Sequence, residues 1–266
     1  MAARHPAAGA EEMNDAEPAG PPKTLAIDIG GTGLKASILD ESGKMVTKRV
    51  RVATPNPCPP QILVNALAKL VAPLPTHDRI SVGFPGVVRD GRIVTAPHFA
   101  DKAWIDYPLE AAISSNLGKP ARLLNDAEVQ GLGIIAGQGL EVVLTLGTGV
   151  GSAVFINGAL TPHLELAHHP IRKNETYNEY LGNAARRALS RRKWNSRVLK
   201  TIEIVYSLLH YDLLYLGGGN AANIVAPLPA NVRIASNDAG LTGGIRLWDD
   251  DIWKSVCGGR EASPVH

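Results

Sequence analysis

Several residue types are scarce in this 266-residue sequence, and each scarcity excludes a class of protein. The two cysteines, Cys58 and Cys257, are too few for a disulfide framework or a four-thiolate zinc site, so we expect two reduced thiols. Aromatic residues make up 5% of the chain, which disfavours a surface that stacks nucleic-acid bases. The 27 basic side chains nearly balance the 25 acidic ones, and a net charge of +2 gives no global attraction to a polyanion.

Long apolar runs are also missing. No stretch approaches the roughly 18 apolar residues that a membrane-spanning helix needs, and residues 1–22 lack the apolar core of a secretion signal. Because residues 1–22 and 255–266 have no apolar period, we predict a flexible tail at each end. We therefore expect a cytoplasmic protein that binds neither a membrane nor nucleic acid.

What the sequence does contain is a series of short apolar runs separated by glycine or proline. In the first half these runs predict strands at 24–29, 34–39, 45–52, 79–84 and 121–125, with helices at 60–71 and 127–136. In the second half they predict strands at 141–146, 152–156 and 212–216, with helices at 177–189, 194–210 and 241–254 and one opened by 217–220. Strands that alternate with helices in this way indicate an α/β protein.

The strand, glycine turn and strand at the start of the chain recur at 141–156. Self-similarity of this kind predicts two related α/β lobes with a cleft between them. We place the first lobe at 23–125 and the second lobe at 126–240.

The glycine turns are candidate phosphate sites, because glycine exposes backbone N–H groups and accepts unusual dihedral angles. The alternative is an ordinary hairpin turn. The candidates are Gly30, Gly31, Thr32, Lys35, Gly147, Thr148, Gly149, Gly218 and Gly219. The helix predicted after 217–220 would add its N-terminal dipole. Asp28, at the mouth of the first turn, is a candidate to hold hydrated Mg²⁺.

Asn125-Asp126 lies where a predicted strand meets a predicted helix. Either residue suits a helix N-cap, and an aspartate at this position also suits a general base that takes the proton of an attacking hydroxyl. The two interpretations are compatible.

Residues 163–170 place three histidines and one glutamate close together, followed by Pro170. Metal binding is one interpretation, although the spacing does not match a helical zinc motif. The other is hydrogen bonding of a polyhydroxylated substrate by Glu165 and His168, with Glu179 as a further acceptor.

A basic run follows, with no acidic residue between Asn183 and Lys200. Its members are Arg186, Arg187, Arg191, Arg192, Lys193, Arg197 and Lys200. The default interpretation is a solvated helix face; the alternative is a site for a polyanion, which counterion release would favour.

The chain from Lys23 to about Trp253 contains a series of short motifs whose order resembles that of the ROK family of sugar kinases and repressors. They are Asp28-Ile29-Gly30-Gly31-Thr32, Phe84-Pro85-Gly86, Asn125-Asp126-Ala127, Leu146-Gly147-Thr148-Gly149-Val150-Gly151, Glu165-Leu166-Ala167-His168 and Gly217-Gly218-Gly219. Within the family, the segments 168–173, 193–195 and 211–220 are most similar to the polyphosphate-using glucokinases.

The resemblance implies an actin-like ATPase fold of two ribonuclease-H-like lobes with a central cleft, in which the final helix of 241–254 returns to the first lobe, and commonly a homodimer. It also implies a kinase that moves a phosphoryl group from inorganic polyphosphate to the 6-hydroxyl of glucose with Mg²⁺, ATP being the alternative donor. Asp126 would be the base. Asn125, Glu165, His168, Glu179 and Gly86 would surround the sugar, and the glycine turns would hold the donor.

Two departures from the family pattern matter. Many relatives have a cysteine-rich zinc motif between His168 and Glu179, whereas this segment has no cysteine, so no structural zinc is expected. Relatives often have Ala-Pro-Asn where this chain has Ala96-Pro97-His98. A sugar-responsive repressor is disfavoured, because residues 1–22 cannot form a helix-turn-helix domain.

Overall fold

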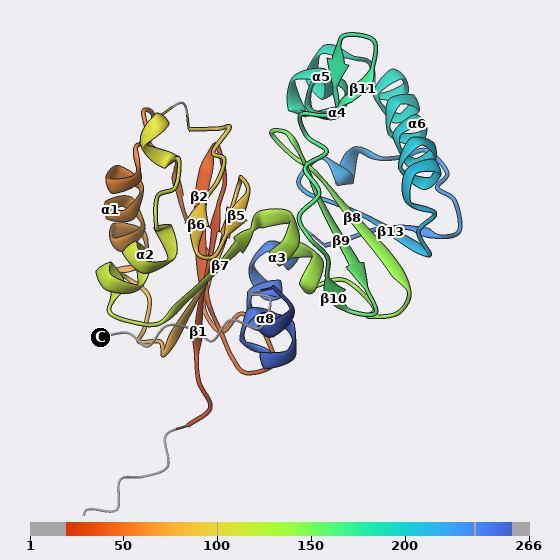
Figure 1. Cartoon of the computed structure of the whole chain (residues 1–266). Helices are drawn as coiled ribbons and strands as arrows, with labels where there is room; N and C mark the ends of the chain where they lie inside the picture. Colours follow the sequence, from red (N-terminus) through yellow and green to blue (C-terminus); the bar gives the residue numbers. More distant parts are fainter. Residues whose placement is uncertain (1–19, 100, 237, 257–266) are drawn as a thin grey trace, which may run out of the picture.

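Two five-stranded sheets of the same design form the two halves of the molecule (Figure 1). The computed structural model describes residues 20–99, 101–236 and 238–256. In each sheet three strands form an antiparallel meander, and two further strands extend it in parallel. The recurrence predicted from the glycine turns is therefore confirmed at the level of topology.

The first sheet has the strand order β3-β2-β1-β4-β7. Its strands are β1 (Thr24–Ile29), β2 (Gly33–Leu39), β3 (Val50–Ala53), β4 (Arg79–Phe84) and β7 (Ala121–Asn125). Most residues of β1, β2 and β4 are buried, since helical segments cover both faces, and their apolar runs are continuous for that reason. The strand predicted at 45–52 begins only at Val50, and Met45 makes an isolated bridge to Leu39.

The second sheet has the order β10-β9-β8-β13-β14. Its strands are β8 (Leu140–Leu146), β9 (Val150–Ile156), β10 (Ala159–Leu160), β13 (Leu213–Gly217) and β14 (Val232–Ile234). Small hairpins stand outside the two sheets: β5 (Val88–Arg89) with β6 (Arg92–Ile93), and β11 (Pro170–Arg172) with β12 (Glu175–Thr176).

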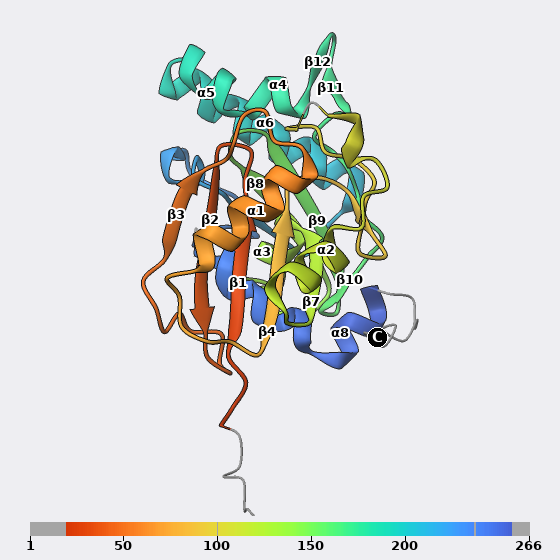
Figure 2. The same ribbon diagram turned by 90° about the vertical axis from the view of Figure 1, so that its left-hand side faces the viewer.

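Helices cover the outer face of each sheet. Figure 2 shows α1 (Pro60–Val71) across the first sheet, next to α2 (Leu109–Leu117). The second sheet is covered by α4 (Tyr177–Leu181), α5 (Asn183–Ala188) and α6 (Arg191–Leu209). An apolar core lies between each sheet and the helices that cover it. Trp104 is fully buried in the first core and Trp194 in the second.

The space between the sheets is filled by α3 (Asp126–Leu132) and the last helical segments of the chain. These are α7 (Ala239–Thr242), the 3-10 turn Gly243–Trp248 and α8 (Asp250–Val256). The first two of these pack on α3 and on the first sheet, where Ser81 Oγ donates to the Gly244 carbonyl over 2.6 Å. The last helix, α8, packs on the 3-10 turn and on β10 of the second sheet, and its Trp253 lies under the Arg122 guanidinium of β7. The segments 239–248 thus return to the first sheet, whereas α8 lies between the two sheets (Figure 1).

Three helix predictions were wrong in detail. The single helix predicted at 241–254 is three short pieces, because Gly243 lies against α3 so closely that a Cβ would be 2.0 Å from the Val129 carbonyl oxygen. The helix predicted at 177–189 breaks at Gly182, where a Cβ would meet the Asn178 carbonyl oxygen at 2.5 Å. After 217–220 only the 3-10 turn Ala221–Asn223 forms, so no helix dipole is added there.

None of the helices in the described part of the chain is long and apolar enough to cross a membrane. Cys58 is buried as a free thiol, and burial raises its pKa. Cys257 and most of the predicted tails at 1–22 and 255–266 lie outside the described residues. Ser255 and Val256 do not belong to a tail, because α8 continues through them.

Candidate active site

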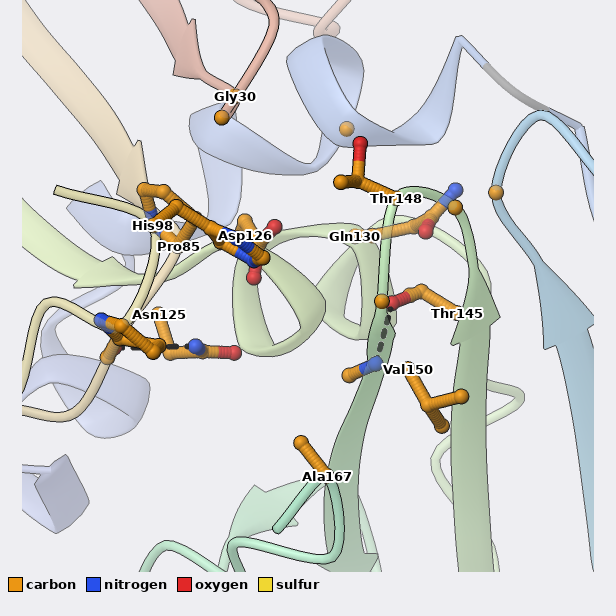
Figure 3. Close-up of a pocket in the computed structure, with 18 of the residues that line it drawn as sticks. Gly30, Pro85, His98, Asn125, Asp126, Gln130, Thr145, Thr148, Val150 and Ala167 are labelled. Carbon is orange, nitrogen blue, oxygen red and sulfur yellow. Dashed lines mark hydrogen bonds between the residues drawn. The ribbon is translucent and has the colours of Figure 1, made fainter. Parts of the chain in front are cut away.

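A cleft of about 350 Å³ lies between the two halves. It is lined by the turns after β1 and β8, the N-terminus of α3, and the loop 163–168. Figure 3 shows Asp126 at the start of α3, with Gly30 and His98 on one side and Thr148 on the other. Every predicted sugar and phosphate residue lines this cleft except Glu179.

The first glycine turn closes tightly between β1 and β2. The Gly30 N–H donates to the Gly33 carbonyl over 3.0 Å, and a Cβ at Gly30 would be 2.9 Å from that oxygen. Thr54 Oγ1 donates to the Gly30 carbonyl over 2.6 Å. These bonds hold the turn in shape and leave Gly31 and Thr32 on the cleft wall.

The second turn is held by side chains from distant parts of the chain. The Gly147 N–H donates to the Gly149 carbonyl over 2.9 Å, and Asn178 Oδ1 accepts the Val150 N–H over 2.6 Å. Asn220 Nδ2 donates to the Gly147 carbonyl over 3.1 Å, which joins this turn to the Gly218-Gly219 segment. The three glycine segments therefore lie around one cavity.

Asn125 is the N-cap of α3, as the sequence predicts. Its Oδ1 accepts the Ala127 N–H over 2.9 Å, and Glu128 Oε2 accepts the Asn125 N–H over 3.1 Å, which completes a capping box. Asn125 Nδ2 also donates to the Gly86 carbonyl over 3.0 Å. The Asn125 amide thus locks the start of α3 to the Pro85-Gly86 turn and orients the neighbouring Asp126.

Asp126 is the group with the most unusual ionisation in the cleft. Burial, followed by the nearby Asp28 carboxylate, raises the pKa of Asp126 to about 7. Its Oδ1 accepts only the Ala127 N–H in the described structure, over 2.9 Å. A carboxylate with this pKa is suited to take up a proton near neutral pH.

The loop 163–168 forms the opposite wall. Glu165 Oε1 accepts the Ala167 N–H over 3.0 Å. Burial opposes ionisation of Glu165, but the nearby His163 imidazole and the hydrogen bond from the Ala167 N–H hold its pKa below the usual value. His98 lies against Gly31, and burial and His168 lower the pKa of His98. Neutral imidazole and ionised carboxylate groups of this kind match the hydroxyls of a sugar.

Glu179 is not in the cleft, which contradicts the sequence prediction. It is the N3 residue of α4, where Glu179 Oε2 accepts from the Thr176 N–H over 2.7 Å and from Thr176 Oγ1 over 2.9 Å. These bonds lower the pKa of Glu179. The Glu179 carboxylate, which the family resemblance assigns to the sugar, is thus part of the capping box of α4.

We therefore expect Glu179→Ala to leave KM for glucose unchanged and to lower the melting temperature slightly, because the variant loses only a helix cap. Steady-state kinetics and thermal denaturation would measure both effects. A rise in KM of about tenfold or more would place Glu179 on the sugar instead.

The basic run is only partly uncompensated. Arg197 pairs with Glu175 at 3.3 Å, and Lys200 pairs with Glu203 at 2.9 Å. Arg186 Nη2 donates to Asn223 Oδ1 over 2.9 Å. The exposed members around the N-terminus of α6 are Arg187, Arg191, Arg192 and Lys193.

Three residues of the site were missed by sequence reasoning. Arg51 reaches the cleft from β3, and a Cβ on Gly33 would be 3.2 Å from its Nε. Asn178 and Gln130 also line the cleft. A helical spacing of four from Asp126 could have indicated Gln130. No local pattern marks the other two, because their partners are distant in sequence. His163 belongs to the histidine cluster that the sequence indicated, but its carboxylate partner Glu128 could not be predicted.

The metal prediction rests on Asp28. Lys35 Nζ donates to Asp28 Oδ2 over 2.7 Å, and the repulsion between Asp28 and Asp126 favours a cation between them. Carboxylate oxygens are the ligands that Mg²⁺ prefers, so these residues fit the ion. Within residues 20–99, 101–236 and 238–256, no group of three His, Cys, Asp or Glu side chains is arranged to hold a metal by itself.

Comparisons with known proteins agree with this geometry. A model described as "ROK family" matches residues 24–175. A polyphosphate glucokinase of Mycobacterium tuberculosis is 32% identical over 235 residues, which are 82% of this chain and 88% of that protein. A crystal structure of an inorganic polyphosphate/ATP-glucomannokinase from Arthrobacter sp. strain KM is 31% identical, with a TM-score of 0.76 over 84% of this chain and 97% of that one. A ROK family glucokinase from Streptomyces griseus shares the fold, with a TM-score of 0.73 at 20% identity, and covers 85% of this chain and 98% of that one.

Proposed function

The chain belongs to the ROK family, and from that premise we propose that it transfers a phosphoryl group from inorganic polyphosphate to the 6-hydroxyl of glucose. Its fold is the actin-like ATPase fold expected from the family resemblance. One observation carries the proposal: Asp126, with a pKa near 7, lies in one cleft with the glycine turns on one side and Glu165 and His168 on the other.

In the proposed reaction Asp126 accepts the proton of the 6-hydroxyl while the hydroxyl oxygen forms a bond to the terminal phosphorus. The bond from that phosphorus to the bridging oxygen of the donor breaks, and the shortened polyphosphate leaves with the electron pair. Asn125 orients Asp126 through the N-cap bond to Ala127. Glu165 and His168 would bind the other sugar hydroxyls.

Donor phosphates would lie on the backbone N–H groups of Gly30–Thr32 and of Gly147–Gly149, with Gly218 and Gly219 beside them. Lys35 and Arg51 are the Lys and Arg side chains among the described cleft residues. Since Lys35 is paired with Asp28, Arg51 is the cation best placed to meet a terminal phosphate. Asp28 would hold Mg²⁺ through water, and the ion would neutralise charge that develops on the transferring phosphoryl oxygens.

The polymer beyond the reacting phosphate would lie on the exposed cations of α5 and α6. Asn223 supports this path, since its side chain accepts from Arg186 and its Nδ2 donates to the Asn220 carbonyl over 3.3 Å. Asn220 in turn is bonded to Gly147 of the second turn. The basic helices and the donor turn are therefore joined by one short hydrogen-bonded segment.

A two-donor assay tests the proposal. Purified protein is given glucose and Mg²⁺ with nucleotide-free polyphosphate, and separately with ATP, and glucose 6-phosphate is measured with a coupled dehydrogenase. We expect product from polyphosphate. Absence of product from both donors, with a folded protein, would refute the proposed function.

Use of ATP as a second donor is the other candidate. The Arthrobacter enzyme is an inorganic polyphosphate/ATP-glucomannokinase, and its 31% identity over 84% of this chain supports the same pair of donors here. The ratio of kcat/KM values for the two donors in the same assay decides between a single and a dual donor.

Neutralising Arg191, Arg192 and Lys193 to glutamine should raise KM for long polyphosphate and leave KM for ATP unchanged. Because three counterion-releasing contacts are lost, the slope of log affinity against log salt should fall by about 2. Fluorescence anisotropy of labelled polyphosphate at several salt concentrations measures the slope.

The matched control is the triple change of Lys48, Lys69 and Lys119 to glutamine, three exposed lysines of the first half. It removes the same net charge far from α6. Equal effects of the two triple variants would mean that only the overall charge matters and that α6 carries no polymer site.

A further inference from the structure

His163 lies between two carboxylates on the wall of the cleft. Its Nδ1 is 2.7 Å from Glu128 Oε1, and its Nε2 is 3.5 Å from Glu165 Oε2. The side chains of His163 and Glu128 are only 13% and 6% exposed, against 32% for Glu165. A buried imidazole in this position bridges two elements that are 35 residues apart in the chain.

The two carboxylates hold different parts of the site. Glu128 completes the capping box of α3 by accepting the Asn125 N–H, so it supports the turn that presents Asp126. Glu165 has its Oε1 on the Ala167 N–H and its Oε2 toward His163. The imidazole therefore joins the N-terminus of α3, on the catalytic side, to the loop on the sugar side.

We propose that His163 is a positioning residue that, as an imidazolium, orients Glu165 toward the sugar and ties the loop 163–168 to the N-terminus of α3. This inference rests on the proposed function and deepens it. A side chain that binds the sugar should keep its direction when the cleft is empty, because binding energy is lost if glucose has to order that side chain. His163 holds Glu165 in this way without touching the reacting atoms.

The charge balance supports an imidazolium. Burial alone would lower the pKa of His163, but the hydrogen bond with Glu128 and the charges of Glu128 and Glu165 outweigh it and raise the pKa to about 9. Two other ionisable groups interact with these carboxylates. His168 helps to lower the pKa of Glu165, and the charges of Glu128 and Glu165 help to raise the pKa of Asp126. The bridge is thus charged throughout the neutral range and does not act as a pH switch there.

The Nε2 of His163 also has no hydrogen-bond partner, although it is buried. Its distance of 3.5 Å from Glu165 Oε2 is an ion-pair distance and too long for a strong hydrogen bond. A small rotation of Glu165 on the arrival of glucose would bring the two atoms into bonding distance. The geometry therefore fits a Glu165 side chain that is held near the position it takes when glucose is bound.

The first test compares His163→Gln, which keeps an N–H donor and loses the charge, with His163→Leu, which loses both. We expect KM for glucose to rise about tenfold in the first and up to about a hundredfold in the second, because Glu165 loses the charged partner that holds its direction. KM for polyphosphate should not change. His169→Gln, an exposed histidine of the same segment outside the cleft lining, is the control and should match the wild type.

The second test separates positioning from mere structural support. His163→Leu leaves Glu128 buried without a cation, which destabilises the fold. Adding Glu128→Gln removes that charge and keeps an amide oxygen for the capping box. We expect the double variant to recover melting temperature while KM for glucose stays high. Recovery of KM together with stability would overturn the proposal and leave His163 a purely structural residue.

The third test does not depend on catalysis. In a pH titration followed by NMR, the His163 ring should titrate near 9, and Glu128→Gln should shift its midpoint downward. A midpoint near the ordinary histidine value would refute the bridge. If wild-type protein makes no glucose 6-phosphate from either donor, the proposed function fails, whereas the NMR result still shows whether the bridge exists.

Discussion

Asp126→Asn should lower kcat for glucose phosphorylation by about a hundred- to ten-thousandfold, the range typical for loss of a general base. Asparagine fills the same volume and can still accept the Ala127 N–H, so the N-terminus of α3 should keep its geometry. KM for glucose should change little, because the sugar contacts lie mainly on the loop 163–168. Initial rates with saturating polyphosphate measure the loss.

Asp106→Asn is a suitable control. Asp106 is an exposed aspartate that pairs with Arg92 outside the cleft, and its variant should keep wild-type kcat. A folded Asp126→Asn protein with kcat within about tenfold of the wild type would rule out Asp126 as the base.

The pH dependence follows from the same carboxylate. Because the pKa of Asp126 is about 7, the base is protonated below that pH, and kcat/KM should rise as pH increases through 7 and then level off. A bound divalent cation favours the ionised form, so the limb in kcat should lie at lower pH than the limb in kcat/KM. In Asp126→Asn this limb should be absent from the residual rate.

The free energy of unfolding should fall over the pH range in which kcat/KM rises. Folding raises the pKa of Asp126 from 3.8 to about 7, so the folded state holds this proton more tightly and loses stability as pH rises between these two values. Asp126→Asn removes that loss. We expect the variant to be more stable than the wild type at pH 8, by on the order of a few kcal/mol, and to show no gain near pH 3. Urea denaturation at the two pH values measures the difference.

Gly218→Ala should destabilise the fold strongly and displace a turn of the cleft. Gly218 has φ of +78°, and a Cβ there would be 2.5 Å from the Leu146 carbonyl oxygen. Backbone atoms of a central strand cannot move aside cheaply, so we expect a loss of about 3 kcal/mol or more in the free energy of unfolding. The displaced turn should also raise KM for the phosphoryl donor.

The next residue is a matched control for this variant. A Cβ on Gly219 would meet no atom within 4 Å, and its φ lies outside the left-handed region, so Gly219→Ala should change the free energy of unfolding only slightly. Denaturation and donor kinetics of the two variants test the distinction. Equal stability of the two alanine variants would show that the segment can relax around Gly218.

Much of the site could be predicted from local patterns in the sequence. The two glycine turns lie where short apolar runs are interrupted, and Asn125-Asp126 lies at a strand-to-helix junction whose capping is a matter of a few neighbouring residues. The recurrence of the strand and turn pattern also predicted the two related sheets. These features depend on interactions within about one turn or one hairpin, which neighbouring residues specify.

The two errors have different causes. The carboxylate of Glu179 caps α4 through Thr176, three residues before it, so the local capping pattern and not the family motif decides where this side chain lies. Arg197 belongs to a run without acidic neighbours, yet Glu175 from β12 pairs with it. For Arg197, the folded chain brings a partner that the run itself lacks.

By itself, the sequence determined the family, the two-lobed α/β design, the glycine turns and the place of Asp126 at a strand-to-helix junction, because each is written in short contiguous motifs. Only the tertiary structure decided that His163 bridges Glu128 and Glu165 and that Arg51 reaches the cleft. The physical reason is that a side-chain contact across the cleft depends on how two separate sheets and their loops pack. No period or spacing along the chain encodes that packing.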